Sequence, residues 1–388
     1  MTDHDTAPPA LHLALEADGD GAHPAAARHP GRSAGAGLTP RGVREAAASA
    51  EEAGYALLTL ADAPLPPATG PAAGPAGRIE AGSRAAFLTL ATDRLGLAPT
   101  LHTTTTEPFH LATQLASLDH ASNGRAAWLV GAADDSGSLA TVGRAPLSPE
   151  KTRREVADVV ETARALWDSW EDDAVIRDVA TGRFLDADRV HHIDFEGAGF
   201  TVKGPLITPR PPQGQVVVLA PDALGIDERA DIVLVSRSTP EEIAERAAEA
   251  RAAGAPLVFA EVEAVLDTDD APAAARLAEL NATADWPGTG RLRHTGSAEE
   301  LTDLLTRLAP LVDGVRLHPA VLAVDGPVLV ERVLPALAAA GLHRPPRAGD
   351  TLRATLGLPR PVSRFATAAA PADPAAPAVS ACPAAINV

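Results

Sequence analysis

The chain has 388 residues, of which 46% are apolar and 3% aromatic, so it is long enough for a substantial core built from Leu, Val, Ile and Ala. Its formal net charge of -18 argues against binding to nucleic acid or to anionic membranes, because clustered Lys and Arg recognise phosphate-rich surfaces. The single cysteine, Cys382, excludes a disulfide within the chain and a metal site built from cysteines.

Short apolar segments along the chain are predicted to be strands. Several of them are apolar on both faces, which is typical of strands in a parallel sheet that is covered on both sides. In chain order the eight segments are 11–17, 55–61, 94–103, 126–133, 215–220, 231–236, 256–266 and 313–319.

Amphipathic helical segments lie between these strands. The strongest start signal is at 238–254, where a Ser/Thr cap, a Pro and two Glu precede the apolar pattern, which ends at Gly254. Eight strands that alternate with helices predict a (β/α)₈ barrel. An open doubly wound sheet is the alternative, although no Gly-x-Gly-x-x-Gly follows the first strand. The other predicted helices are 40–54, 108–122, 148–170, 297–312 and 326–341.

A single domain is predicted over 1–365, followed by a disordered tail. The tail, 366–388, is rich in Ala and Pro, a composition that does not support a packed core. The first residues are acidic and lack a basic start followed by an apolar stretch, so no signal peptide is expected. No apolar run approaches the length of a membrane span, and a cytoplasmic location is expected.

A resemblance to a known family is carried by 101–128, LHTTTTEPFHLATQLASLDHASNGRAAW. This segment is similar to the pattern Ser-Thr-Thr-x-x-Glu-Pro-Tyr/Phe-His followed by Ala-Ser-Leu-Asp-His-Leu-Ser-x-Gly-Arg in luciferase-like flavin-dependent monooxygenases. Within that family it resembles the branch that includes nitrilotriacetate and dibenzothiophene-sulfone monooxygenases. The same resemblance extends over 25–31, 165–215, 313–322 and 349–366. It implies a (β/α)₈ barrel, in agreement with the pattern of predicted strands.

The resemblance also implies an activity. Members of the family use reduced FMN, supplied by a separate flavin reductase, and O₂ to oxygenate a small organic substrate. A homodimer is implied as well. His29, after the first strand, and His318, at the end of the last, are candidate substrate-binding or proton-transfer groups at the barrel mouth, where such barrels hold their active sites.

The flavin-binding residues implied by the resemblance lie at strand ends. Asp62, Thr103 and Thr104 would hold the flavin ring, and Arg153 would reach the phosphate. A structural interpretation stands beside each of the first three. Asp62 precedes Pro64 and is suited to cap a turn or helix, whereas the threonines are β-branched residues that suit a strand.

Departures from the family pattern fall where FMN would bind. Leu129 replaces an Asn that contacts flavin in the family. At the position expected to receive the phosphate, Pro221 lacks an N–H donor and Asp222 adds a negative charge. Relatives also carry a long insertion where this chain has only 266–291.

Other functions therefore stay open. The first is a degenerate barrel that no longer binds FMN and acts as a partner subunit or binds another ligand. It would be favoured if side chains fill the mouth, whereas Asp222 turned away and Arg153 turned inward would favour the monooxygenase. A deazaflavin-dependent barrel is a third possibility. A metal site at His191 and His192 is weakly supported, because that pair lies in a segment that the family resemblance predicts to be a loop.

Overall fold

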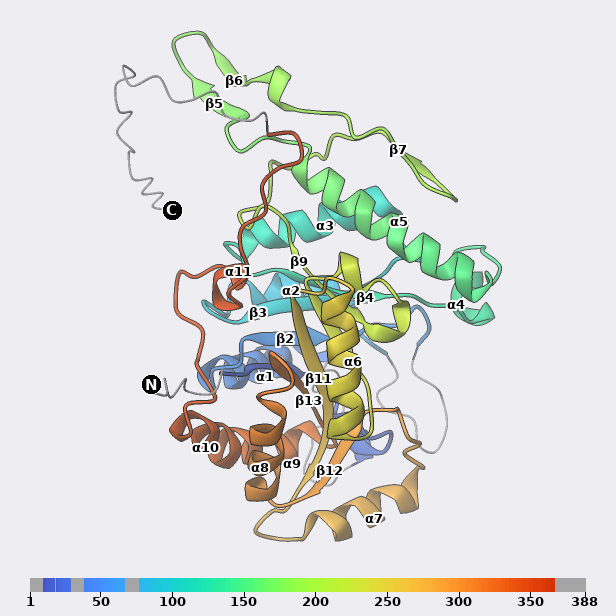
Figure 1. Ribbon diagram of the computed structural model, residues 1–388, viewed down its shortest axis with the longest axis vertical. Coiled ribbons are helices and arrows are strands. Elements are labelled where there is room, and N and C mark those ends of the chain that lie inside the picture. The colour runs from blue at the N-terminus through green and yellow to red at the C-terminus, as the bar shows by residue number, and fades with distance from the viewer. Residues whose placement is uncertain (1–9, 18, 29–37, 67–76, 367–388) are drawn as a thin grey trace, which may run out of the picture.

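The computed structural model describes residues 10–17, 19–28, 38–66 and 77–366 (Figure 1). The candidate residue His29 and the predicted tail beyond Ala366 lie outside the described residues. Among the helices that the structure does describe, none has the length and apolar character needed to cross a membrane.

Eight parallel strands close into a barrel, which confirms the predicted fold and excludes the open sheet. Each strand pairs with the next, and the last pairs with the first, with His12 opposite Gly314. An additional strand, β12 (Leu292–Gly296), pairs with the outer half of β11 and is not part of the barrel. The barrel strands are β1 (His12–Glu16), β2 (Leu57–Leu60), β3 (Gly96–His102), β4 (Ala127–Gly131), β9 (Val217–Pro221), β10 (Ile232–Val235), β11 (Leu257–Leu266) and β13 (Gly314–Pro319).

Helices surround the barrel and begin where the sequence carries caps. The side chains of Thr39, Ser148, Thr239 and Ser297 each accept a hydrogen bond from a backbone N–H of the first helical turn. The predicted helices are observed as α1 (Pro40–Glu52), α3 (Pro108–Ala121), α5 (Pro149–Asp168), α6 (Pro240–Ala252), α8 (Ala298–Leu308) and a last unit made of α9 (Leu322–Val328), a π-helical turn (Leu329–Val333) and α10 (Leu334–Ala339).

Several further elements are not predicted by the sequence patterns. The shortened segment 266–291 contains a helix, α7, and short two-stranded ladders follow α5. These elements are α2 (Ala81–Leu88), α4 (Ser136–Ala140), α7 (Ala273–Thr283), α11 (Leu352–Thr355), β5 (Val175–Asp178) with β6 (Arg183–Leu185), β7 (Phe195–Glu196) with β8 (Thr201–Val202), and 3-10 turns at Ala26–Arg28, Ala187–Arg189, Asp222–Leu224 and Asp227–Arg229.

The core has two layers, one on each side of the barrel wall. Outward side chains pack against the helices, and inward ones form a second apolar cluster that includes Ala14, Leu57 and Phe259. That inner cluster is closed at the amino ends of the strands by α11, because Leu352 packs against Gly96 at the start of β3. At this end the ring of His12, at the start of β1, stacks on Phe259, whereas ionisable side chains in mutual contact lie at the opposite end.

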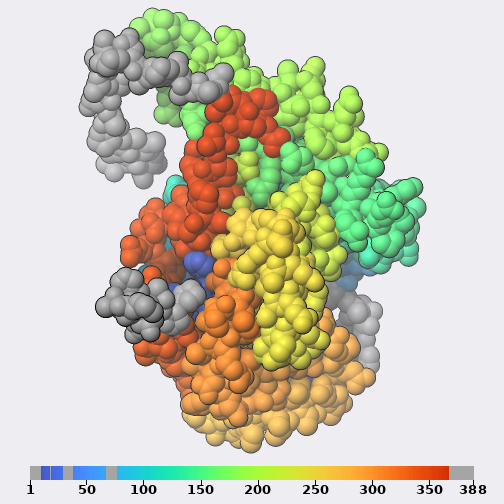
Figure 2. Space-filling view, viewed as in Figure 1, coloured from blue at the N-terminus to red at the C-terminus, as the bar shows by residue number. Residues whose placement is uncertain are grey.

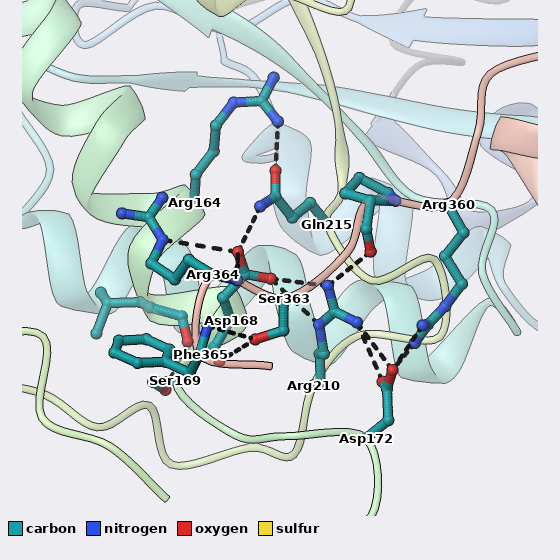
Figure 3. A network of polar contacts seen from close by, with 12 residues as sticks. Arg164, Asp168, Ser169, Asp172, Arg210, Gln215, Arg360, Ser363, Arg364 and Phe365 are labelled. Carbon is teal, nitrogen blue, oxygen red and sulfur yellow. Dashed lines mark hydrogen bonds and ion pairs between the residues drawn. The ribbon is translucent and has the colours of Figure 1, made fainter. Parts of the chain in front are cut away.

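The segment after α11 returns to α5 and is held there by a buried polar network (Figure 3). Arg210 and Asp168 form an ion pair of 2.9 Å, and both side chains are 2% exposed. Ser363 Oγ donates to the Asp168 carbonyl at 3.2 Å, and Arg360 pairs with Asp172 at 2.6 Å. In Figure 2 this segment, in red, runs over the surface towards the green region that contains α5. Two parts of the sequence that share the family resemblance, 165–215 and 349–366, are thus in contact.

Candidate active site at the barrel mouth

Charged side chains occupy the inner face of the barrel near the carboxyl ends of the strands. Successive side chains of a strand alternate between faces, so Glu16 follows Ala14 on the inner face of β1 and Glu261 follows Phe259 on β11. Arg316 enters the same space from β13, opposite Glu261. The segments of β1, β11 and β13 are predominantly apolar in sequence, yet each of these three strands places an ionisable side chain inside the barrel.

Arg316 is the centre of this network. Its guanidinium donates to Glu261 Oε1 at 2.6 Å and to Thr59 Oγ1 at 2.9 Å, and it also contacts the Glu16 carboxylate. Burial lowers the pKa of Arg316 to about 9, so the side chain stays protonated near neutral pH. The network therefore forms the inner floor of the mouth with its charges paired.

His318, a predicted substrate-binding or proton-transfer residue, belongs to this floor. It is 2% exposed, and its Nε2 lies 3.2 Å from Glu261 Oε1. Burial, together with the charge of Arg316, lowers the pKa of His318 to about 3, so the ring is neutral and donates to Glu261. Burial raises the pKa of Glu261, but hydrogen bonds from His318 and Ser236 outweigh that effect and lower it to about 2. The structure thus places His318 in contact with a carboxylate, with little tendency to take up a proton near neutral pH.

A second set of ion pairs covers the floor from β12 and the residues before it. Arg293 Nε lies 2.7 Å from Glu263 Oε2, and Arg291 pairs with Glu261 at 3.4 Å. The guanidinium of Arg293 also stacks on the ring of Trp286, 3.8 Å from its centroid. The sequence patterns do not indicate Trp286, Arg291 or Arg293. These residues lie in or just after the shortened segment, where the patterns predict no strand.

A cavity of about 490 Å³ opens beside this floor, at the ends of β2 and β3. Thr100 and His102 line it, and their Oγ1 and Nδ1 atoms are buried without a hydrogen-bond partner in the part of the chain that the structure describes. Asp62 lines the same cavity, but its carboxylate accepts from the N–H groups of Ala63 (2.8 Å) and Ala81 (2.7 Å). Asp62 therefore holds its own loop against the start of α2, in keeping with the capping interpretation.

Thr103 and Thr104 do not line this cavity. Thr103 Oγ1 donates to the carbonyl of Gly131 at 3.1 Å, and Thr104 Oγ1 accepts from the N–H of Ala133 at 2.9 Å. Both side chains are buried. These two hydrogen bonds join the loop after β3 to the end of β4. The hydroxyl groups expected to face the flavin ring thus bond to the protein backbone.

The imidazole of His102 lies directly against Gly131 on β4. A Cβ atom at Gly131 would come within 2.8 Å of His102 Nδ1, closer than real side-chain contacts allow. His102 Nε2 also lies 3.1 Å from the carbonyl oxygen of Asp62, which fixes the ring from its other side. The glycine therefore provides the space that the histidine occupies, and neither residue was predicted.

Gly131→Ala is expected to destabilise the fold by about 1–3 kcal/mol, because the ring of His102 cannot retreat from the new methyl group without losing its contact with Asp62. Urea unfolding followed by circular dichroism measures this loss. His102→Ala provides the matched background, in which Gly131→Ala should cost much less. Equal costs in the two backgrounds would contradict the contact between them.

At the turn after β9, where the flavin phosphate is expected, the negative charge of Asp222 is balanced by two arginines. Asp222 pairs with Arg237 at 2.8 Å and with Arg246 at 3.2 Å. Arg153 lies over the same turn, since a Cβ atom at Gly225 would be 2.7 Å from its Nε. Leu129 belongs to the inner apolar cluster and is 5% exposed, so it fills part of the barrel interior.

No group of three or more His, Cys, Asp or Glu converges as a metal site among the described residues.

Known proteins of similar sequence and fold place this chain in a family. The family described as luciferase-like monooxygenase matches residues 22–312. The chain is 28% identical to N-acetyl-S-(2-succino)cysteine monooxygenase of Bacillus subtilis, over 92% of this chain and 98% of that protein. It is 38% identical to nitrilotriacetate monooxygenase component A of Aminobacter aminovorans, over 38% of this chain and 33% of that one. In fold it is similar to EDTA monooxygenase from Chelativorans sp. BNC1, with a TM-score of 0.79 and 22% identity over 90% of this chain and 99% of that chain. The chain belongs to the luciferase-like monooxygenase family.

Proposed function

We propose that this chain is an FMN-dependent two-component monooxygenase that receives reduced flavin from a separate reductase and oxygenates a small organic molecule. The observation that carries the proposal is a pair of buried polar atoms, Thr100 Oγ1 and His102 Nδ1, which have no hydrogen-bond partner among the described residues and belong to side chains that line one cavity of the mouth. Buried polar atoms are nearly always hydrogen-bonded, so two of them at one cavity favour a ligand that supplies the partners. The monooxygenase names of the relatives support the reaction class.

The residues present fit the ring of a flavin. A volume of about 490 Å³ lies within the usual range of ligand sites, roughly 300–1,000 Å³. Thr100 and His102 would hold the polar edge of the ring, and the paired charges around Arg316 would close the floor beneath it. When bound, FMN supplies the oxygen-activating chemistry, whereas the side chains of this chain bind, orient and exclude water.

At the proposed phosphate position, an arginine side chain would take the place of the backbone and hydroxyl donors of the family pattern. Arg153 would receive the phosphate, because a guanidinium pairs well with phosphate oxygens. Asp222 does not oppose this, since its charge is balanced by Arg237 and Arg246. Pro221 still removes one backbone donor. A homodimer located in the cytoplasm, as the family resemblance implies, is part of the same proposal.

A non-catalytic barrel is the second candidate function, and one observation favours it. Leu129 and the ion pairs around Arg316 fill the inner part of the mouth, where a cofactor would otherwise reach deeper. Such a chain would act as the partner of an active homologue or bind another ligand. The two candidates differ in whether flavin binds at all.

The deciding experiment is a titration of the purified chain with FMN, oxidised and photoreduced under anaerobic conditions, followed by flavin absorbance and fluorescence. Micromolar or tighter binding of the reduced form is expected. Absence of binding in both states at high micromolar flavin would reject the monooxygenase and leave the non-catalytic barrel.

Arg153→Ala is expected to weaken binding of reduced FMN about 10- to 100-fold, the loss that follows removal of a charge-assisted hydrogen bond. Riboflavin, which lacks the phosphate, should bind equally well to the wild type and the variant. Arg154→Ala, at the exposed neighbouring position, is the control and should leave both affinities unchanged. An equal loss for FMN and riboflavin would show that Arg153 does not receive the phosphate.

A further inference from the structure

A second cavity lies outside the barrel wall, between α1 and α9. Its volume is about 300 Å³, and Leu15, Ala46, Leu322 and Val330 contribute apolar walls. It shares no lining residue with the cavity at the ends of β2 and β3. It is therefore a separate space from the proposed flavin site.

Small residues leave this space open. Gly42, Ala46 and Ala50 recur every fourth residue on α1, which places them on one face of the helix, towards the cavity. On the other side, α9 contributes Gly326 and is followed by a π-helical turn that contains Val330. Turns of this kind are rare and often occur at binding sites.

Tyr55 provides a buried polar group in the cavity, whereas Glu45 and Ser49 line it from exposed positions. Its side chain is 0% exposed and lines the cavity, and its hydroxyl has no hydrogen-bond partner among the residues that the structure describes. Burial raises the pKa of Tyr55, so the hydroxyl is neutral. A buried hydroxyl without a partner is unfavourable, and a bound molecule that supplies the partner would remove that cost.

We propose that this cavity binds a small neutral molecule that is mainly apolar and carries one hydroxyl or carbonyl group for Tyr55. A charged ligand is disfavoured, because the described residues that line the cavity include no basic residue and one acid, Glu45, which is paired with Arg41 at 2.6 Å. The volume is about twice the ~150 Å³ of an engineered cavity that holds benzene, so a substituted ring fits. Alcohols, ketones and phenols of that size are the class of ligand.

The test uses 4-fluorophenol and its apolar analogue fluorobenzene, each titrated into the full chain and followed by ¹⁹F NMR. The wild type is expected to bind 4-fluorophenol about 5- to 10-fold more tightly, which corresponds to one net hydrogen bond. Tyr55→Phe should abolish this preference and leave the affinity for fluorobenzene unchanged. Without ligand, it should not lower the melting temperature, because no hydrogen bond within the protein is lost.

Ala46→Leu fills the cavity and is expected to abolish binding of both probes. Ala48→Leu adds the same volume on the exposed side of α1 and should change neither affinity. If Ala46→Leu does not fold, Gly326→Leu serves instead, because a Cβ atom there meets only the Leu322 side chain at 3.7 Å and the longer side chain takes up cavity volume. A phenol preference that survives Tyr55→Phe, binding that survives the filled cavity, or no binding of either probe at millimolar concentration would overturn the proposal.

Discussion

Arg316→Met is expected to destabilise the fold by about 3–5 kcal/mol, the usual cost of removing one partner from a buried ion pair. The substitution keeps much of the side-chain volume but removes the base of Glu16. It also leaves Glu261 with Arg291, at 3.4 Å, as its remaining cation among the described residues. Both acids are largely shielded from water, since their side chains are 10% and 4% exposed. Urea unfolding at neutral pH, followed by circular dichroism, measures the loss.

The double variant Arg316→Met, Glu261→Gln should regain part of this stability, because it removes one of the two buried carboxylate charges that lose Arg316. Arg332→Met is the control, since Arg332 pairs with Asp269 at the surface and an exposed pair contributes little. An Arg316→Met protein as stable as the wild type would show that the mouth is open to water and that its floor is not a fixed structure.

The barrel was predictable because its strands and helices carry strong local signals. Segments that are apolar on both faces can be buried only in a covered parallel sheet, and caps such as Thr239 and Ser297 mark where helices begin. β12 lacks such a signal, because Arg293 and His294 interrupt its apolar pattern and it pairs with β11 only beyond the residues that pair with β10. α7 lies in the segment that is shorter than in relatives, where the resemblance offered no guide.

The site was less predictable, because its contacts join residues far apart in the sequence. A charge within an apolar strand, such as Glu261 or Arg316, was the available signal, yet only barrel closure shows that these side chains meet. Asp62 illustrates the opposite difficulty. A carboxylate before a turn has two interpretations in the sequence, and the structure shows both its place at the cavity and its hydrogen bonds to α2.

His102 and Gly131 show why single positions mislead when a site has changed. Each is unremarkable alone, a polar residue at a strand end and a glycine before a loop. Their contact across β3 and β4 shows that a large side chain on one strand depends on the absence of one on the other. Leu129 lies next to this pair in the barrel wall. The loss of an Asn at that single position is therefore not enough to decide whether a ligand binds there.

Arg210→Ala is expected to cost about 3–5 kcal/mol and to release the C-terminal segment from α5 (Figure 3). Asp168 would keep a buried charge whose remaining ion-pair partner among the described residues, Arg364, is exposed and lies 3.6 Å away. Arg210 also donates to the Pro361 carbonyl at 2.8 Å, so the substitution removes a direct tether to that segment. Limited trypsin digestion should then cleave after Arg364 faster than in the wild type, and mass spectrometry identifies the loss of 365–388.

Arg360→Ala is the matched control, since Arg360 reaches the same segment through an exposed pair with Asp172 and should change cleavage and stability only slightly. Equal effects of the two variants would mean that the exposed pair, not the buried one, holds the segment. If only Arg210→Ala releases the segment, the barrel core should be weakened as well. The reason is that α11 directly precedes this segment and closes the inner apolar cluster through Leu352 and Leu356. The far end of the barrel would thus depend on an ion pair that lies outside it.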